Sequence, residues 1–205
     1  MRQVRGDEVR FVMDRIPRRR WIGFLLIAIC GAAVDLATKS WLFSWPELRR
    51  GAIWWIWPEY FGFQISLNEG ALFGFGQGGV WIFAVISILA GVAIPIWLFT
   101  FRAAQDRWLT FAMALVLGGI LGNLYDRLGL HRLDWGVFDP SRAGETAYAV
   151  RDWILVQWSN DLRWPNFNIA DSMLVCGAIL LLWHGLFIAK PERDEKETSS
   201  GNAPV

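Results

Sequence analysis

Four stretches of this chain are long and apolar enough to cross a membrane as helices. The hydrocarbon core of a bilayer is about 30 Å thick, and ~20 mostly apolar helical residues are needed to span it. We expect spans at residues 21–43, 80–101, 108–128 and 168–189. Where charges occur in these stretches, they lie near one end. The pattern predicts an all-α membrane protein with four transmembrane helices, in which residues 21–189 form one membrane domain.

The segment between the first two spans has a different pattern. Residues 53–57 and 60–65 alternate between side-chain types and are rich in aromatic residues, which predicts two short strands. We therefore expect a small extracytoplasmic β-sheet region that leans on the membrane. Its aromatic side chains are interfacial anchors or substrate contacts, and the pattern leaves both open.

Lys and Arg residues gather on one side of the predicted bundle. They crowd residues 1–20, the turn at 102–107 and the tail at 190–205, and the outer loops at 44–79 and 129–167 carry some as well. Because cytoplasmic flanks are enriched in Lys and Arg, both termini are expected in the cytoplasm. The N-terminal tail is basic, and the C-terminal tail is polar and expected to be disordered.

Polar side chains near the spans gather at the outer membrane face. Charged groups at membrane depth are costly, usually face the bundle interior and often mark a functional site. Two structural alternatives stay open, because Asp35 and Lys39 could pair along one helix face and Asp126 with Arg127 could anchor a helix at the interface. The layer contains Asp35, Lys39, Asn68, Glu69, Asn123, Asp126, Arg127, Asn168 and Asp171.

Composition narrows the function further. The chain is 54% apolar and has 14 Trp residues, which favour membrane–water interfaces. A net charge of +1 gives no reason to expect a nucleic-acid partner. The two histidines are far apart and no HExxH or paired CxxC occurs, so no metal site is expected. Cys30 and Cys176 lie in apolar runs and are expected to be small buried residues.

Five short motifs fall on or beside this polar layer. They are V-D-L-A-T-K at 34–39, L-N-E-G-A-L-F-G at 67–74, G-G-I-L-G-N-L-Y-D-R-L at 118–128, V-R-D-W-I at 150–154 and F-N-I-A-D-S at 167–172. In this order they resemble the signal peptidase II family, the bacterial lipoprotein signal peptidases. The glycines of the third motif also favour close helix approach.

The resemblance implies roles for individual residues. The family's catalytic carboxylates correspond to Asp152 and Asp171, while Asp126 becomes a supporting residue beside Arg127. Asp35 and Lys39 would brace the outer helix ends. The residues expected to hold the substrate backbone and position the carboxyl pair are Asn68, Gly70, Asn123, Arg127, Asn168 and Ala170. Residues 130–149 exceed the family's usual link and are expected to form an inserted outer loop at the surface.

The resemblance also implies an activity. The expected function is a membrane aspartic endopeptidase that removes the signal peptide from prolipoproteins, cleaving before a Cys that carries diacylglycerol. Two neighbouring carboxyls suit this chemistry, because one keeps a proton while the other activates water. The expected partners are prolipoproteins and membrane lipids, without a cofactor and with the enzyme as a monomer. The expected location is the bacterial inner membrane, with the active site near the outer leaflet.

Two rival functions belong to other classes. A small transporter or channel would use the Asp and Arg residues as an ion path, but such charges would be expected at mid-membrane. A scaffold that has lost activity would be expected to lack one of the paired aspartates. The position of the polar layer and the presence of both Asp152 and Asp171 favour the peptidase.

Overall fold

Four long helices form most of the computed structural model, which describes residues 16–70, 78–159 and 162–188. They are α1 (Arg18–Leu42), α3 (Val80–Thr100), α4 (Arg107–Arg127) and α5 (Ile169–Trp183), and the π-helical η5 (His184–Ile188) extends α5. All four are long and apolar enough to cross a membrane. Their boundaries lie within a few residues of the expected spans. Most of the tail at 1–20 and the whole tail at 190–205 fall outside the described residues.

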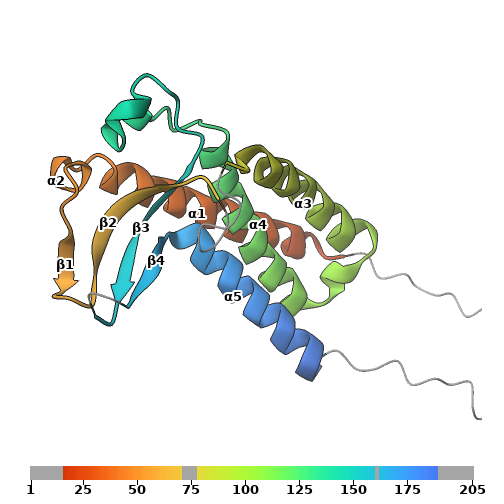
Figure 1. The fold of residues 1–205 in the computed structure, drawn as a ribbon. Helices are drawn as coiled ribbons and strands as arrows, with labels where there is room; N and C mark the ends of the chain where they lie inside the picture. The colour runs from red at the N-terminus through yellow and green to blue at the C-terminus, as the bar shows by residue number, and fades with distance from the viewer. Residues whose placement is uncertain (1–15, 71–77, 160–161, 189–205) are drawn as a thin grey trace, which may run out of the picture.

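Helix α4 lies at the centre of the bundle and packs against α1, α3 and α5 (Figure 1). Of its apolar stretch, 44% is buried, against 22% or less in the other three helices. Close packing requires glycine, because a Cβ atom on Gly119 would lie 2.5 Å from the carbonyl oxygen of Ala170. The close helix approach expected from the glycine motif is therefore confirmed.

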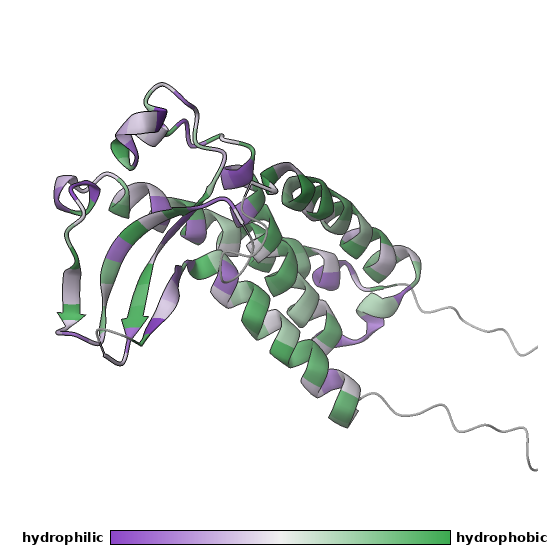
Figure 2. Ribbon diagram, viewed as in Figure 1, coloured by the Kyte–Doolittle hydropathy of each residue, from purple (hydrophilic) through white to green (hydrophobic). Residues whose placement is uncertain are grey.

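Hydrophobic residues predominate along the long helices (Figure 2), and many of their large apolar side chains are exposed. Exposing such side chains to lipid costs little free energy because lipid tails are apolar too, whereas exposing them to water would be unfavourable. The same surfaces carry Cys30 and Cys176, and both are exposed. The expectation that these cysteines are buried is wrong, because an apolar run in a membrane protein does not distinguish lipid-facing from core positions.

An antiparallel sheet adjoins one end of the bundle (Figure 1). Its strands, in spatial order, are β1 (Trp54–Trp57), β2 (Phe61–Asn68), β3 (Val150–Gln157) and β4 (Arg163–Phe167). The first two strands agree with the expected alternation. The other two were not predicted, because β3 is buried on both faces and therefore lacks a two-residue period.

Apolar side chains fix the sheet to the bundle. Leu42 and Phe43 at the end of α1, Leu48 of the short helix α2 (Pro46–Arg49), and Ile65 and Trp153 of the sheet form one buried cluster. The sheet is thereby held against the end of the bundle where the expected polar layer lies. The overall class, four membrane helices with a small sheet, is as expected.

The insert at 130–149 is folded rather than a simple surface loop. It contains the 3-10 turns η3 (Trp135–Val137) and η4 (Pro140–Arg142). Trp135 is 8% exposed and Ala147 is fully buried, so the insert has a small core of its own.

Candidate active site

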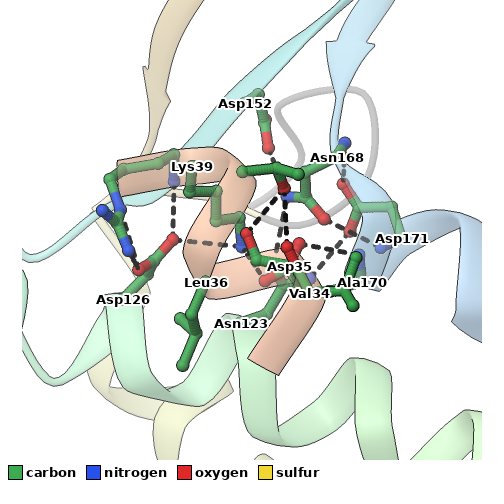
Figure 3. A network of polar contacts seen from close by, with 12 residues as sticks. Val34, Asp35, Leu36, Lys39, Asn123, Asp126, Asp152, Asn168, Ala170 and Asp171 are labelled. Atoms are coloured by element: carbon green, nitrogen blue, oxygen red, sulfur yellow. Dashed lines mark hydrogen bonds and ion pairs between the residues drawn. The ribbon is translucent and has the colours of Figure 1, made fainter. Parts of the chain in front are cut away.

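Asp152 and Asp171 reach the site from two different elements. Asp152 lies on β3, opposite Ser66 of β2, and Asp171 lies in the first turn of α5. Figure 3 shows both side chains beside Asn168, which immediately precedes α5. Residues that are 19 positions apart are therefore brought to one place because β4 returns the chain from β3 to the start of α5.

A capping box fixes the start of α5. The Asn168 side-chain oxygen accepts a hydrogen bond from the backbone N–H of Asp171 at 2.9 Å, and the Asp171 Oδ2 atom accepts one from the backbone N–H of Asn168 at 3.1 Å. An Asn at the cap with an acidic residue three positions later satisfies two otherwise unpaired helix donors. The F-N-I-A-D-S motif thus orients one oxygen of the Asp171 carboxyl through local structure.

Two amide side chains link the two carboxyls. The Asn168 Nδ2 atom donates to Asp152 Oδ1 at 2.6 Å and to Asn123 Oδ1 at 3.2 Å. The Asn123 Nδ2 atom donates to Asp171 Oδ1 at 2.8 Å. These asparagines are almost completely buried, so their donors and acceptors must find partners within the protein. The structure therefore brings both expected asparagines into the site.

Asn68 of β2 contacts the second carboxyl oxygen of Asp152. Its Nδ2 atom donates to Asp152 Oδ2 at 3.2 Å, and its Oδ1 atom accepts from the backbone N–H of Gly70 at 2.9 Å. Asp152 is thus contacted through both carboxyl oxygens. Residues 71–74 of the same motif lie outside the described residues.

Lys39 is fully buried, and three side-chain oxygens lie within 3.1 Å of its ammonium group. It lies 2.7 Å from Asp35 Oδ2 and 3.1 Å from Asp126 Oδ2, and it donates to Asn123 Oδ1 at 2.9 Å. The contact to Asn123 has hydrogen-bond geometry, whereas the two carboxylates face the ammonium as ion pairs. The alternative that Asp35 and Lys39 pair along one face is correct, but the same Lys39 also contacts Asn123, which holds Asp171.

Asp126 pairs with a residue that the sequence reasoning missed. Arg151 donates to Asp126 Oδ1 from Nε at 3.0 Å and from Nη2 at 2.8 Å, and its backbone N–H donates to Oδ2 at 3.0 Å. Consecutive strand residues point to opposite faces. The Arg151 side chain therefore points towards Asp126, whereas the Asp152 side chain points towards Asn168. The interpretation of Asp126 with Arg127 as an interface anchor is wrong, because Asp126 is fully buried in this network.

Two further expected residues have indirect places in the site. The backbone N–H of Ala170 donates to Asp35 Oδ1 at 2.9 Å and so ties α5 to α1. The Arg127 guanidinium lies 5.6 Å from the centre of the Phe83 ring, within electrostatic range of both Asp152 and Asp171. Its Nε atom is buried and has no hydrogen-bond partner among the described residues.

The surroundings of Asp152 favour its protonated form. Burial raises the pKa of Asp152 to about 8, with a further contribution from the neighbouring negative charge of Asp171. Hydrogen bonds from Asn168 and Asn68 and the charge of Lys39 oppose this rise. These surroundings therefore favour a proton on Asp152 at neutral pH.

An apolar cavity opens beside the pair. It has a volume of about 270 Å³ and is lined by Trp164, Phe167, Asp171, Ser172, Val175 and Cys176. A larger cavity of about 440 Å³ is lined by Trp108, Ile179, Leu180 and Trp183, none of which titrates. The smaller cavity is therefore the better candidate for a substrate site. Within the described ranges, no three His, Cys, Asp or Glu side chains gather as metal ligands.

The fold and the site define a multi-pass membrane protein with a buried carboxyl pair at one end of its helix bundle. The model of the family described as signal peptidase (SPase) II matches residues 27–187. A lipoprotein signal peptidase of Rhodopirellula baltica is 48% identical over 167 residues, covering 81% of this chain and 72% of that protein. One of Pseudomonas fluorescens is 35% identical, covering 78% of this chain and 85% of the relative.

Solved structures agree with these relatives. A structure described as a bacterial membrane enzyme superimposes with a TM-score of 0.63 at 26% identity, over 83% of this chain and 94% of the other. The chain belongs to the signal peptidase II family, and it is a membrane protease of the aspartic type. The resemblance stated from the five motifs is thereby confirmed.

Proposed function

We propose that this protease removes the signal peptide from prolipoproteins, cleaving before a Cys that carries diacylglycerol, with Asp152 and Asp171 as its catalytic pair. The observation that carries the assignment is the bridge of Asn168 and Asn123 between the two carboxyls. The family relatives are named for lipoprotein signal peptides, which supports the substrate.

The surroundings of the pair assign different roles to the two carboxyls. Asp171, whose oxygens accept from Asn123 and the Asn168 backbone, is the ionised base that takes a proton from water. Asp152 donates its proton to the scissile carbonyl oxygen as hydroxide adds to the carbon. The tetrahedral intermediate then collapses: the C–N bond breaks and the amine leaves with the proton from Asp171. As the carbonyl re-forms, its hydroxyl proton returns to Asp152, which restores both carboxyls to their starting states.

The supporting residues fall into two groups under this proposal. Asn68, Gly70 and Asn168 keep Asp152 and Asp171 in position, and Arg127 binds a carbonyl oxygen of the substrate. Deeper in the bundle, the four charges of Asp35, Lys39, Asp126 and Arg151 hold α1, α4 and β3 together. The Ala170 backbone connects this deeper network to α5. The apolar cavity beside Asp171 suits a lipid-modified or apolar part of the substrate.

The proposed topology follows from charge. Basic residues flank the helix ends that lie away from the sheet. Under this proposal the protein lies in the bacterial inner membrane, and these helix ends and both termini face the cytoplasm. The sheet and the carboxyl pair then lie at the outer leaflet. We further propose that the enzyme works as a monomer in contact with membrane lipids and needs no cofactor.

The test uses purified full-length protein in detergent micelles and a diacylglyceryl-modified lipoprotein precursor. Asp152→Asn and Asp171→Asn should each reduce cleavage by at least about a thousand-fold, since each removes one half of the acid–base pair. Asp139→Asn is the matched control, because Asp139 caps an exposed turn of the insert. Full cleavage by either dyad variant would rule out the assignment, and an unmodified precursor cleaved equally well would rule out the lipid requirement.

A further inference from the structure

The insert at 130–149 forms a closed lobe on the sheet side of the molecule. Backbone hydrogen bonds join its two arms, from Trp135 N to Glu145 O at 2.9 Å and from Ala147 N to Leu133 O at 2.9 Å. Its buried residues pack against Leu67 of β2. The lobe is therefore a fixed part of the fold that contacts the strand leading into the site.

One arginine of the lobe reaches the N-E-G segment that follows this strand. The Arg142 Nη2 atom lies 3.2 Å from Glu69 Oε1, and its Nε atom lies 2.9 Å from Glu145 Oε2. The same guanidinium stacks over the Trp135 ring at 4.1 Å. The Trp135 stack holds the guanidinium in place beside Glu69, whereas the Glu145 carboxylate is 57% exposed and holds it only weakly.

The lobe also contacts the start of α3. The ring of Tyr148 lies 5.1 Å from that of Trp81. Glu69 and Trp81 stand on either side of residues 71–77, which are outside the described residues. The lobe thus contacts the described chain on both sides of that segment.

Glu69 is adjacent to the side chain that contacts Asp152. Asn68 donates to Asp152 Oδ2 at 3.2 Å, and Gly70 N donates back to Asn68 Oδ1 at 2.9 Å. Because Asn68 and Glu69 are adjacent in the chain, a contact that fixes Glu69 also restricts the backbone of Asn68. Two side-chain contacts and the peptide bond between Asn68 and Glu69 thus connect Arg142 to Asp152.

We infer that the lobe is a positioning element of the active site, in which Arg142 acts through Glu69 to hold Asn68 against Asp152. The inference rests on the proposed catalytic role of Asp152. The simple alternative is a surface ion pair, which contributes little on its own. This pair differs because it joins residues 73 positions apart and both side chains are at least two-thirds buried.

The experiment compares Arg142→Gln, Glu69→Gln and the double variant with Glu145→Gln as the matched control. Glu145 is the other carboxylate on Arg142, but it contacts no residue of the site. Each of the two single variants should lower kcat about five-fold, the change that ~1 kcal/mol produces, with KM little altered. The double variant should be no slower than the slower single variant, because both remove one interaction. Arg142→Lys should recover part of the loss.

The pH profile separates positioning from general destabilisation. The hydrogen bond from Asn68 stabilises ionised Asp152, so its loss should move the alkaline limb of kcat to higher pH. The groups that face Asp152 from other elements, Asp171, Lys39 and Arg127, are unchanged in these variants. A structural role alone would leave this limb in place.

Two results would overturn the inference. One is kcat in Arg142→Gln equal to that of Glu145→Gln. The other is a loss of kcat that follows thermal stability, with an unmoved alkaline limb. Asp152→Asn keeps the two proposals apart, since retained cleavage in that variant refutes the catalytic assignment itself. If Asp152→Asn is inactive and Arg142→Gln is fully active, only the positioning role fails.

Discussion

Replacing Lys39 by Met tests how much the buried charge network contributes to stability. Lys39 and its partners Asp35 and Asp126 have no exposed surface, and the ammonium lies 2.7 and 3.1 Å from their carboxyls. Lys39→Met leaves Asp35 without a cation and removes one of the two cations on Asp126. Breaking a buried pair from one side costs about 3–5 kcal/mol, because the remaining charge stays buried.

A compensating substitution makes this prediction sharper. In the double variant Asp35→Asn/Lys39→Met the uncompensated charge is gone, and the amide oxygen introduced at position 35 can still accept from the Ala170 backbone. We expect the double variant to regain at least about 2 kcal/mol relative to Lys39→Met alone, because neutral replacements of buried pairs are often well tolerated. Arg50→Met is the matched control, since Arg50 and Glu47 are 71% and 64% exposed.

The measurement is unfolding in mixed micelles of denaturing and mild detergent, followed by tryptophan fluorescence from the 14 Trp residues. Arg50→Met should change the free energy of unfolding by no more than about 1 kcal/mol. The reasoning fails if Lys39→Met is as stable as Arg50→Met. It also fails if the double variant is less stable than Lys39→Met.

Two other predictions concern pH and packing. Burial raises the pKa of Asp152 to about 8, so its proton is present at neutral pH and lost as the pH rises. We therefore expect kcat/KM to fall about ten-fold per pH unit above that value. An unchanged kcat/KM at pH 10 in folded enzyme would contradict the proposed acid. Gly119→Ala should destabilise the protein by about 1–3 kcal/mol, because the new methyl would meet Ala170 O at 2.5 Å. Gly23→Ala on α1 has no neighbour within 4 Å and should be neutral or slightly stabilising in the same thermal unfolding assay, so equal effects at the two glycines would refute the packing argument.

The membrane helices and the polar layer could be predicted from sequence because the bilayer constrains them in one dimension. The length of an apolar run gives a span, and the depth of a charge follows from its place in that run. The capping box at Asn168 and Asp171 is equally local, since its residues are three positions apart. Asp152 was identified only by resemblance to the family. It lies on a strand outside the apolar spans, so its depth in the membrane could not be read from a span.

Contacts that depend on tertiary register could not be predicted. Arg151 gave no local signal beside Asp152, and its pairing with Asp126 follows only once β3 is placed against the end of α4. The insert was expected as a surface loop because Gly, Pro and Ser favour turns. Its folded state depends on the packing of Trp135 with Ala147, and on the contact of Arg142 with Glu69. Neither can be read from local composition.

The buried network of Asp35, Lys39, Asp126 and Arg151 has two negative and two positive charges. Moving a single charge across a membrane changes its electrostatic energy by about 2.3 kcal/mol for each 100 mV of membrane potential. Because these four charges cancel and lie together at one end of the bundle, the membrane potential does almost no net work on them. The protein can therefore use full charges to fix its helices in an energised membrane without becoming a voltage sensor.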